Sequence, residues 1–237
     1  MQNSTSVSKP VIIAIEGNIG AGKSTLLRHL KESFDQQGVR DDVIQFMQEP
    51  VDLWESVRDE TGETILAKFY RDQEKYAFAF QIMAYTSRLA AFKRLIALNP
   101  GCKVIVCERS LDADRNIFAK MMRDDGTIDS VSHQVYEMLF KNTSWEFETE
   151  MVVYMDTDPE KCIERIGLRA REGESIIQLD YLAKCKKYYD EWMSHMCEHS
   201  TKTVVHIDSN VDTDYQSSGE IGPQWVELIH KLAKSFI

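Results

Sequence analysis

The chain has 237 residues, of which 43% are hydrophobic, and its formal net charge is −10. This length is enough to bury one sizeable core, so we expect a single α/β domain over residues 1–237. No apolar run reaches the ~18 residues of a membrane-spanning helix. The acidic balance argues against nucleic acid as a partner, because such binding depends on Lys and Arg contacts to phosphate.

The N-terminal segment and the cysteines favour a cytoplasmic protein. The roughly ten residues before the first apolar run have the layout of neither a secretory signal nor an organelle presequence. The five cysteines are an odd number without a C-x-x-C pair. This pattern is typical of free thiols in a reducing compartment rather than of disulfides or a zinc site.

Short runs rich in Val and Ile alternate with helical stretches along the chain. The expected strands are 10–15, 43–47, 103–107, 151–155 and 203–207. The expected helices are 23–36, 74–98, 112–123, 130–141, 159–171, 179–197 and 223–236, with loops at 56–64 and 209–222 and a turn at 124–129. The continuous apolar runs are typical of strands buried on both faces of a parallel sheet. The alternation predicts a doubly wound α/β fold, in which ligands bind at the carboxyl ends of the strands.

The first expected strand runs into the sequence GNIGAGKST. It matches the phosphate-binding pattern G-x-x-x-x-G-K-[ST], in which Lys23 reaches the β- and γ-phosphates and Ser24 ligates Mg²⁺. Backbone N–H groups of the loop converge on phosphate oxygens, and the helix N-terminus adds its dipole. The full pattern in this context predicts a nucleoside triphosphate site rather than a glycine turn without a ligand. The expected binding residues are Gly17, Asn18, Gly20, Ala21, Gly22, Lys23, Ser24 and Thr25.

The second expected strand ends in Gln48-Glu49-Pro50. Pro50 stops the strand and leaves Glu49 at the carboxyl edge of the sheet, beside the glycine loop. A carboxylate there can take a proton from a substrate hydroxyl as general base. An ordinary exposed loop acid is the alternative interpretation.

The long expected helix carries three informative faces. Its apolar positions follow helical spacing and are expected to pack on the sheet: Phe78, Ile82, Tyr85, Leu89, Phe92 and Ile96. Gln81, Ala84 and Arg88 form an adjacent stripe, in which Gln can pair with a base edge and Ala leaves room for one. A solvent-facing stripe is the alternative. Phe80 and Met83 lie on a further apolar face that could serve a helix–helix dimer contact.

The third expected strand closes with Glu108 and Arg109. Two charges at the end of an apolar strand are costly unless they are used. Glu108 can hold Mg²⁺ opposite Ser24, and Arg109 can neutralise a phosphate or keep Glu49 ionised. A structural Glu–Arg pair is the alternative.

The segment RIGLRARE contains Arg165, Arg169 and Arg171. The first two are i, i+4 neighbours on one helix face. Three arginines so close together in an acidic chain predict a phosphate clamp that closes as a lid, over about residues 165–177. A solvated helix face, balanced by neighbouring glutamates, is the alternative.

Together these motifs resemble the deoxynucleoside kinases of the deoxycytidine/deoxyguanosine kinase type. The matching segments span residues 12–182: IEGNIGAGKST, QEPVDLW, FQ-x-x-x-x-x-SR, ERS-x-x-x-DR-x-IF, and RIGLRAREGE followed by LDYL. The resemblance implies a P-loop nucleoside-kinase fold, with a five-stranded parallel sheet flanked by helices and an arginine-rich lid. It also implies Mg²⁺-dependent transfer of the γ-phosphoryl group of ATP to the 5′-hydroxyl of a deoxynucleoside, and a homodimer formed through long helices.

The same resemblance implies roles for single residues. Glu49 is the general base, and Arg109 orients it and the hydroxyl. Arg165 and Asp212 belong to the donor site, while Tyr70 and Glu174 hold the sugar 3′-hydroxyl. The base pocket is formed by Trp54, Phe80, Gln81 and Phe118. Ala84, Arg88 and Asp114 match family members that accept purines and cytosine, which favours deoxyadenosine, deoxycytidine or deoxyguanosine over thymidine.

Two other functions stay open. A nucleoside monophosphate kinase of the thymidylate-kinase type shares the P-loop and lid, but it needs further basic residues for the phosphate of its acceptor. A non-catalytic nucleotide-binding module of the GTPase type would show D-x-x-G directly after a strand and an N-K-x-D motif, and we find neither. Such a module would also have no need for Glu49, Arg109 and the lid arginines together.

Overall fold

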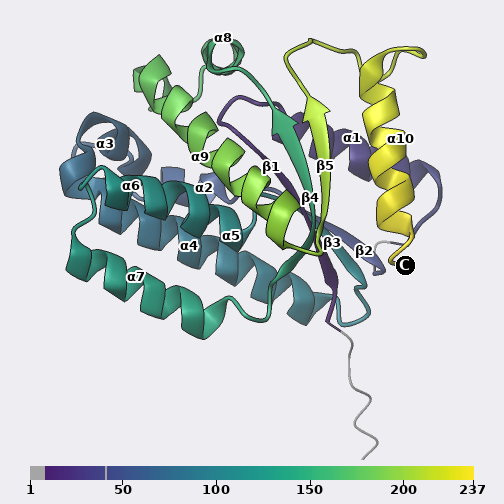
Figure 1. The fold of residues 1–237 in the computed structure, drawn as a ribbon, viewed down its shortest axis with the longest axis horizontal. Helices are drawn as coiled ribbons and strands as arrows, with labels where there is room; N and C mark the ends of the chain where they lie inside the picture. The colour runs from purple at the N-terminus through teal and green to yellow at the C-terminus, as the bar shows by residue number, and fades with distance from the viewer. Residues whose placement is uncertain (1–8, 41) are drawn as a thin grey trace, which may run out of the picture.

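Five parallel strands form the centre of the fold, in the spatial order β2-β3-β1-β4-β5 (Figure 1). The computed structural model describes residues 9–40 and 42–237. β1 lies in the middle, where Ile13 is in register with Val106 of β3 and Met151 of β4. The strands are β1 (Val11–Gly17), β2 (Ile44–Met47), β3 (Val104–Glu108), β4 (Thr149–Asp156) and β5 (Thr203–Asp208).

Helices cover both faces of the sheet. Figure 1 shows α1 and α10 on one face, and α4, α7 and α9 on the other. The α-helices are α1 (Lys23–Gln36), α2 (Val51–Ser56), α3 (Ile65–Arg71), α4 (Gln73–Leu98), α5 (Leu111–Ala113), α6 (Lys120–Asp124), α7 (Ser130–Thr143), α8 (Pro159–Arg169), α9 (Leu179–His199) and α10 (Ile221–Lys234). A π-helix, η1 (Asp114–Ala119), joins α5 to α6, and a 3₁₀ turn, η2 (Glu174–Ile176), precedes α9.

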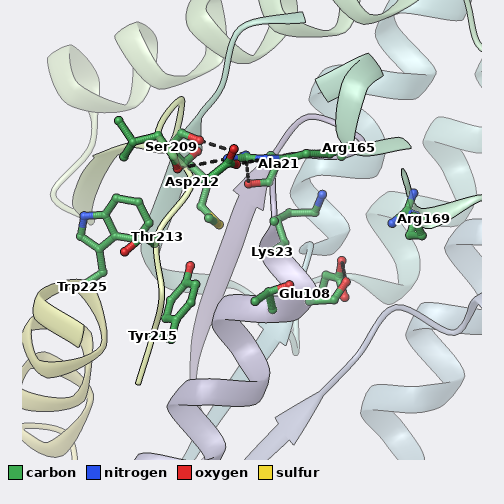
Figure 2. Close-up of a pocket in the computed structure, with 16 residues that line it drawn as sticks. Ala21, Lys23, Glu108, Arg165, Arg169, Ser209, Asp212, Thr213, Tyr215 and Trp225 are labelled. Carbon is green, nitrogen blue, oxygen red and sulfur yellow. Dashed lines mark hydrogen bonds and ion pairs between the residues drawn. The ribbon is translucent and has the colours of Figure 1, made fainter. Parts of the chain in front are cut away.

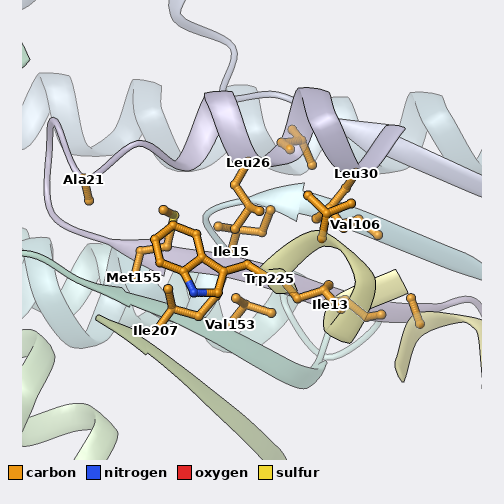
Figure 3. Close-up of a cluster of buried hydrophobic side chains, with 14 of the residues drawn as sticks. Ile13, Ile15, Ala21, Leu26, Leu30, Val106, Val153, Met155, Ile207 and Trp225 are labelled. Atoms are coloured by element: carbon orange, nitrogen blue, oxygen red, sulfur yellow. The ribbon is translucent and has the colours of Figure 1, made fainter. Parts of the chain in front are cut away.

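The core is divided between the two faces because successive strand residues point in opposite directions. Ile13 and Ile15 of β1 pack with α1 and with Trp225 of α10 (Figure 3). Ile12 and Ala14 pack with the face of α4 that helical spacing predicted. That face is formed by buried Tyr85, Leu89 and Phe92, flanked by half-buried Phe78, Ile82 and Ile96.

The structure confirms the parallel five-stranded sheet and departs from the expected helices at three places. The expected helix over 112–123 is divided into α5, η1 and α6. Helical periodicity does not reveal this, because a π-turn only widens the helix locally. The helices α2 and α3 were not predicted, since six or seven residues are too few to show a period.

The expectation of a dimer contact at Phe80 and Met83 is wrong. The ring of Phe80 stacks on Phe69 of α3 at 4.6 Å between centroids, and it lies edge-on to Trp54 of α2 at 5.5 Å. Met83 packs on the cluster that contains Val51 and Trp54. The two unpredicted helices therefore cover this face from within the same chain.

The expectation of free thiols is confirmed, because all five cysteines are unpaired and only Cys197 is exposed. Over the described residues, we find no helix with the combined length and apolar character that a membrane crossing requires.

Candidate active site

The glycine loop lies between the end of β1 and the start of α1. Gly20 and Gly22 have left-handed φ angles of 82° and 97°. A Cβ at Gly20 would lie 2.5 Å from the Cys162 carbonyl oxygen, so this close approach requires glycine. The Lys23 Nζ donates to the Asn18 carbonyl oxygen at 2.7 Å, which holds the ammonium over the loop. Burial, together with the charge of Arg109, lowers the pKa of Lys23 to about 8.

Two adjoining cavities open at the carboxyl edge of the sheet. The larger, of about 410 Å³, runs from the glycine loop to Tyr215 and Trp225 (Figure 2). The narrower is enclosed by α2, α3, α4 and η1 and is lined by Trp54, Phe80 and Gln81. Both cavities are bordered by Lys23, Glu108 and Arg169. A group bound in one cavity can therefore reach a group bound in the other.

Glu49 follows β2 and lies in the wall of the narrower cavity, with its side chain 15% exposed. Its Oε1 accepts a hydrogen bond from Arg88 Nη2 at 2.6 Å and lies 3.2 Å from Arg109 Nε. Burial alone would raise the pKa of Glu49, but the charges of Arg109, Arg88, Lys23 and Arg171 outweigh it and lower the pKa below the ordinary value. The carboxylate is thus held ionised, with both arginines on Oε1.

A second carboxylate completes the surroundings of Arg88. Arg88 is 1% exposed, and it pairs with Asp114 at the start of η1 through Nη1 while Nη2 reaches Glu49. Gln81 Nε2 donates to the Asp114 carbonyl oxygen at 3.1 Å. The stripe formed by Gln81, Ala84 and Arg88 is therefore buried against the cavity, and the solvent-facing alternative is wrong.

Arg109 adopts a left-handed backbone, with φ at 64°, which is uncommon outside glycine. Its guanidinium lies 4.9 Å from the centre of the Phe118 ring and contacts Tyr189 as well as Glu49. A strained backbone of this kind persists only where its surroundings hold it, and such strain is concentrated at functional sites.

The three arginines of the lid separate into two groups. Arg169 Nε and Arg171 Nη1 each bind Glu174, at 3.1 Å. Arg165 instead turns to the larger cavity, where it donates to the Ser209 carbonyl oxygen and to Asp212 Oδ1, both at 2.9 Å (Figure 2). The i, i+4 spacing places Arg165 and Arg169 on one helix face, but the two side chains bind different partners.

Ser24 and Glu108 offer a pair of oxygens to a cation beside the glycine loop. Ser24 Oγ donates to Glu108 Oε1 at 2.8 Å. Hydroxyl and carboxylate oxygens suit Mg²⁺, which usually keeps water and substrate phosphate as its other ligands. Among residues 9–40 and 42–237, no group of three or more His, Cys, Asp or Glu could hold a metal by itself. The two oxygens fit an Mg²⁺ ion whose other ligands are water and substrate phosphate.

Comparison with known proteins identifies the family. The deoxynucleoside kinase profile matches residues 13–230. A probable deoxycytidine kinase of fowlpox virus is 32% identical over 205 residues, covering 86% of this chain and 80% of the viral protein. The deoxycytidine kinase of Bos taurus is 32% identical over 204 residues, covering 77% of this chain and 75% of its own. The mitochondrial deoxyguanosine kinase of Xenopus laevis is 25% identical over 246 residues, covering 95% and 89%.

The chain belongs to the deoxynucleoside kinase family. The site residues expected of a deoxynucleoside kinase mostly gather at the two cavities. The narrower cavity is lined by Glu49, Trp54, Phe80, Gln81, Ala84, Arg88, Arg109, Asp114, Phe118, Arg171 and Glu174. The larger is lined by Gly20, Ala21, Gly22, Lys23, Ser24, Thr25, Arg165, Arg169 and Asp212.

Three expected residues of this deoxynucleoside kinase lie behind the cavity walls. Gly17 ends β1, where a Cβ would meet the Met155 carbonyl oxygen at 2.6 Å. Asn18 Nδ2 donates to the Leu182 carbonyl oxygen at 2.8 Å, which ties the loop to α9. Tyr70 packs edge-on against Tyr181, and it is the ring of Tyr181 that lines the cavity.

The structure adds residues that the sequence did not single out. Tyr215 and Trp225 line the far end of the larger cavity, and Phe69 and Met122 line the narrower one. These positions look like core or loop in the sequence, and nothing local marks them. Glu16 and Tyr189 lie directly behind Arg109. Glu16 carried a usable signal, a charge near the end of an apolar strand.

The burial of Asp114 predicts a large loss of stability on neutralisation. Asp114→Asn leaves Arg88, 1% exposed, with one carboxylate fewer, and we expect a loss of about 3 kcal/mol in the free energy of unfolding. The control is Glu137→Gln, which breaks the half-exposed pair with Arg115 and should cost at most about 1 kcal/mol. Urea unfolding measures both, and equal losses would contradict the importance of burial.

Proposed function

We propose that the chain, acting as one domain, transfers the γ-phosphoryl group of ATP to the 5′-hydroxyl of a deoxynucleoside. The observation that carries the proposal is the meeting of the two cavities at Lys23, close to an ionised Glu49. The larger cavity takes the triphosphate and the narrower takes the nucleoside. The free cysteines fit work in a reducing compartment such as the cytoplasm.

Glu49 takes the proton of the attacking hydroxyl. Because both arginines bind Oε1, Oε2 is the oxygen offered to the substrate. As the 5′-oxygen bonds to the γ-phosphorus, the bond from that phosphorus to the β–γ bridging oxygen breaks, and the hydroxyl proton passes to Glu49. A general base of this kind contributes about 10²–10⁴-fold to the rate.

Cationic groups at the junction stabilise the transferring group, whose charge is spread over its equatorial oxygens. Lys23 lies between the cavities, and Arg169 lines both of them. Mg²⁺, held by Ser24 and Glu108 together with the donor phosphates, would neutralise charge on the β- and γ-oxygens. Arg165 and Asp212 line the larger cavity and not the narrower one, which assigns them to the donor side.

The buried polar groups of the narrower cavity favour an amino-bearing base. Asp114 and Gln81 lie together with Arg88 beside the aromatic wall of Trp54 and Phe80. A base that offers donors and acceptors to these polar groups is favoured over one that leaves their remaining hydrogen bonds unmade. We therefore propose deoxyadenosine, deoxycytidine or deoxyguanosine as the acceptor, in preference to thymidine.

A steady-state panel tests the reaction and the acceptor together. It compares the four deoxynucleosides and their 5′-monophosphates with ATP and Mg²⁺, for the unmodified protein and for Glu49→Gln. We expect turnover of amino-bearing nucleosides, and a fall in kcat of about 10²–10⁴-fold in the variant with little change in KM. Glu137→Gln, the same chemical change outside both cavities, should behave like the unmodified protein.

Each alternative has its own outcome in this panel. A preference for thymidine would overturn the base argument and leave the kinase. Turnover of monophosphates alone would show that the protein is instead a nucleoside monophosphate kinase of the thymidylate-kinase type. No turnover would indicate a nucleotide-binding module.

We further propose a homodimer in which α7 forms the contact. The exposed face of α7 carries Val131 (67% exposed), Val135 (49%) and Met138 (65%) at helical spacing. Apolar side chains grouped in this way are typical of a protein contact.

A homodimer predicts that the sedimenting mass falls when acidic residues replace the apolar residues on this face of α7. Val131→Asp combined with Met138→Asp should convert the dimer to a monomer in sedimentation velocity at one protein concentration. Leu228→Asp, an exposed apolar position on α10, is the control and should leave the dimer intact. An unmodified protein that sediments as a monomer would contradict the proposal.

A further inference from the structure

Glu16 is a fully buried carboxylate near the end of β1 that has no part in the reaction described above. Its Oε1 accepts hydrogen bonds from the Ser110 backbone N–H and from Ser110 Oγ, both at 2.7 Å. Its Oε2 accepts from the Tyr189 hydroxyl at 3.2 Å. Burying a carboxylate is costly, so a fully buried carboxylate that is held by three donors calls for an explanation.

The groups around Glu16 offset only part of the cost of its burial. Burial raises the pKa of this carboxyl above its ordinary value, and the hydrogen bonds from Ser110 and the charge of Arg109 limit that rise. The three groups at hydrogen-bond distance all donate, and an ionised carboxylate can only accept.

Both the backbone and the side chain of Arg109 are tied to this carboxylate. On the backbone side, Glu16 holds Ser110, the next residue, and the Arg109 N–H donates to the Ile15 carbonyl oxygen at 3.0 Å. On the side-chain side, the Tyr189 hydroxyl contacts Glu16 and accepts from Arg109 Nη1. These ties hold the left-handed backbone of Arg109 in place.

The other edge of the same guanidinium contacts Glu49, with Nε 3.2 Å from Oε1. One arginine therefore joins two carboxylates, one that faces the substrate cavity and one that is sealed behind it. The cations that act on Glu49 are Lys23, Arg88, Arg109 and Arg171, and Asp114 is a carboxylate close enough to oppose them. The cations that act on Glu16 are Arg109 and Arg88, with Lys23 nearby.

We propose that Glu16 is a positioning residue for phosphoryl transfer: through Ser110 and Tyr189 it holds Arg109 in the conformation that contacts Glu49. This inference rests on the proposed function, because it assigns Glu16 a role in the same reaction. Glu16 lines neither cavity, so it acts only through Arg109.

The test compares Glu16→Gln and Tyr189→Phe with a matched control, Tyr154→Phe. Tyr154 also donates its hydroxyl to a carboxylate, Asp190, at 2.9 Å. Its ring stacks on Tyr189, and the Phe variant keeps that contact while it removes a hydrogen bond that involves none of Glu16, Arg109 and Glu49. Three quantities are measured for each variant: kcat and KM for the nucleoside, the pH profile of kcat/KM, and a crystal structure of the protein without substrate.

The proposal expects a specific pattern in Glu16→Gln. A displaced Arg109 no longer lowers the pKa of Glu49, so the acid limb of the pH profile moves to higher pH. We expect kcat to fall by about 10- to 100-fold, the size of effect that a misplacement of about 1 Å produces, while KM changes little. The crystal structure should show Arg109 moved from Glu49. Tyr189→Phe should show the same changes to a smaller extent, and Tyr154→Phe should show none.

Other results overturn the proposal. In one such result, Arg109 of Glu16→Gln still contacts Glu49 and the acid limb of the pH profile does not move. Glu16 would then be a structural residue only, whatever the stability of the variant. If Glu16→Gln does not fold, Tyr189→Phe decides by the same criteria. If the unmodified protein phosphorylates no nucleoside, the proposed function fails, and the crystal structures alone decide whether Glu16 positions Arg109.

Discussion

The contact between Glu49 and two buried arginines is the interaction on which the rest of the site depends. Burial alone would raise the pKa of Glu49, whose side chain is only 15% exposed. Arg88 and Arg109 reverse this by placing positive charge on Oε1. Each arginine is itself buried and needs a second anionic or polar partner, which Asp114 and Tyr189 provide. Neutralising one of these groups therefore disturbs the others.

The order of the strands explains why the two cavities meet where they do. The carboxyl ends of β1, β2 and β3 lie side by side, so the glycine loop, Glu49 and Glu108 come together from three distant parts of the sequence. The α2, α3 and α4 helices enclose the narrower cavity, and Arg169, the last residue of α8, lies where the two cavities meet. In the proposed reaction, acceptor selection and proton removal share one residue, because Arg88 binds both Asp114 and Glu49.

The features that could be predicted from the sequence are those that a local residue pattern reveals. The parallel strands, the glycine loop, and the charges Glu49, Glu108 and Arg109 that follow buried strands were all visible in it. The remainder depends on contacts between distant segments. Tyr189 meets Glu16 across 173 residues and has the spacing of a core position on α9. The covering of Phe80 by α2 and α3 was missed because these helices are too short to show a period.

The most direct measurement is an infrared titration of the Glu49 carboxylate in the substrate-free protein, assigned by its difference from Glu49→Gln. Since positive charge outweighs burial at this site, the carboxylate band should persist as the pH falls and should disappear only below the ordinary range of glutamate. A carboxyl that takes up its proton at or above that range would show that burial dominates. Glu49 would then not be held ionised by the two arginines, and this account of the site would be contradicted.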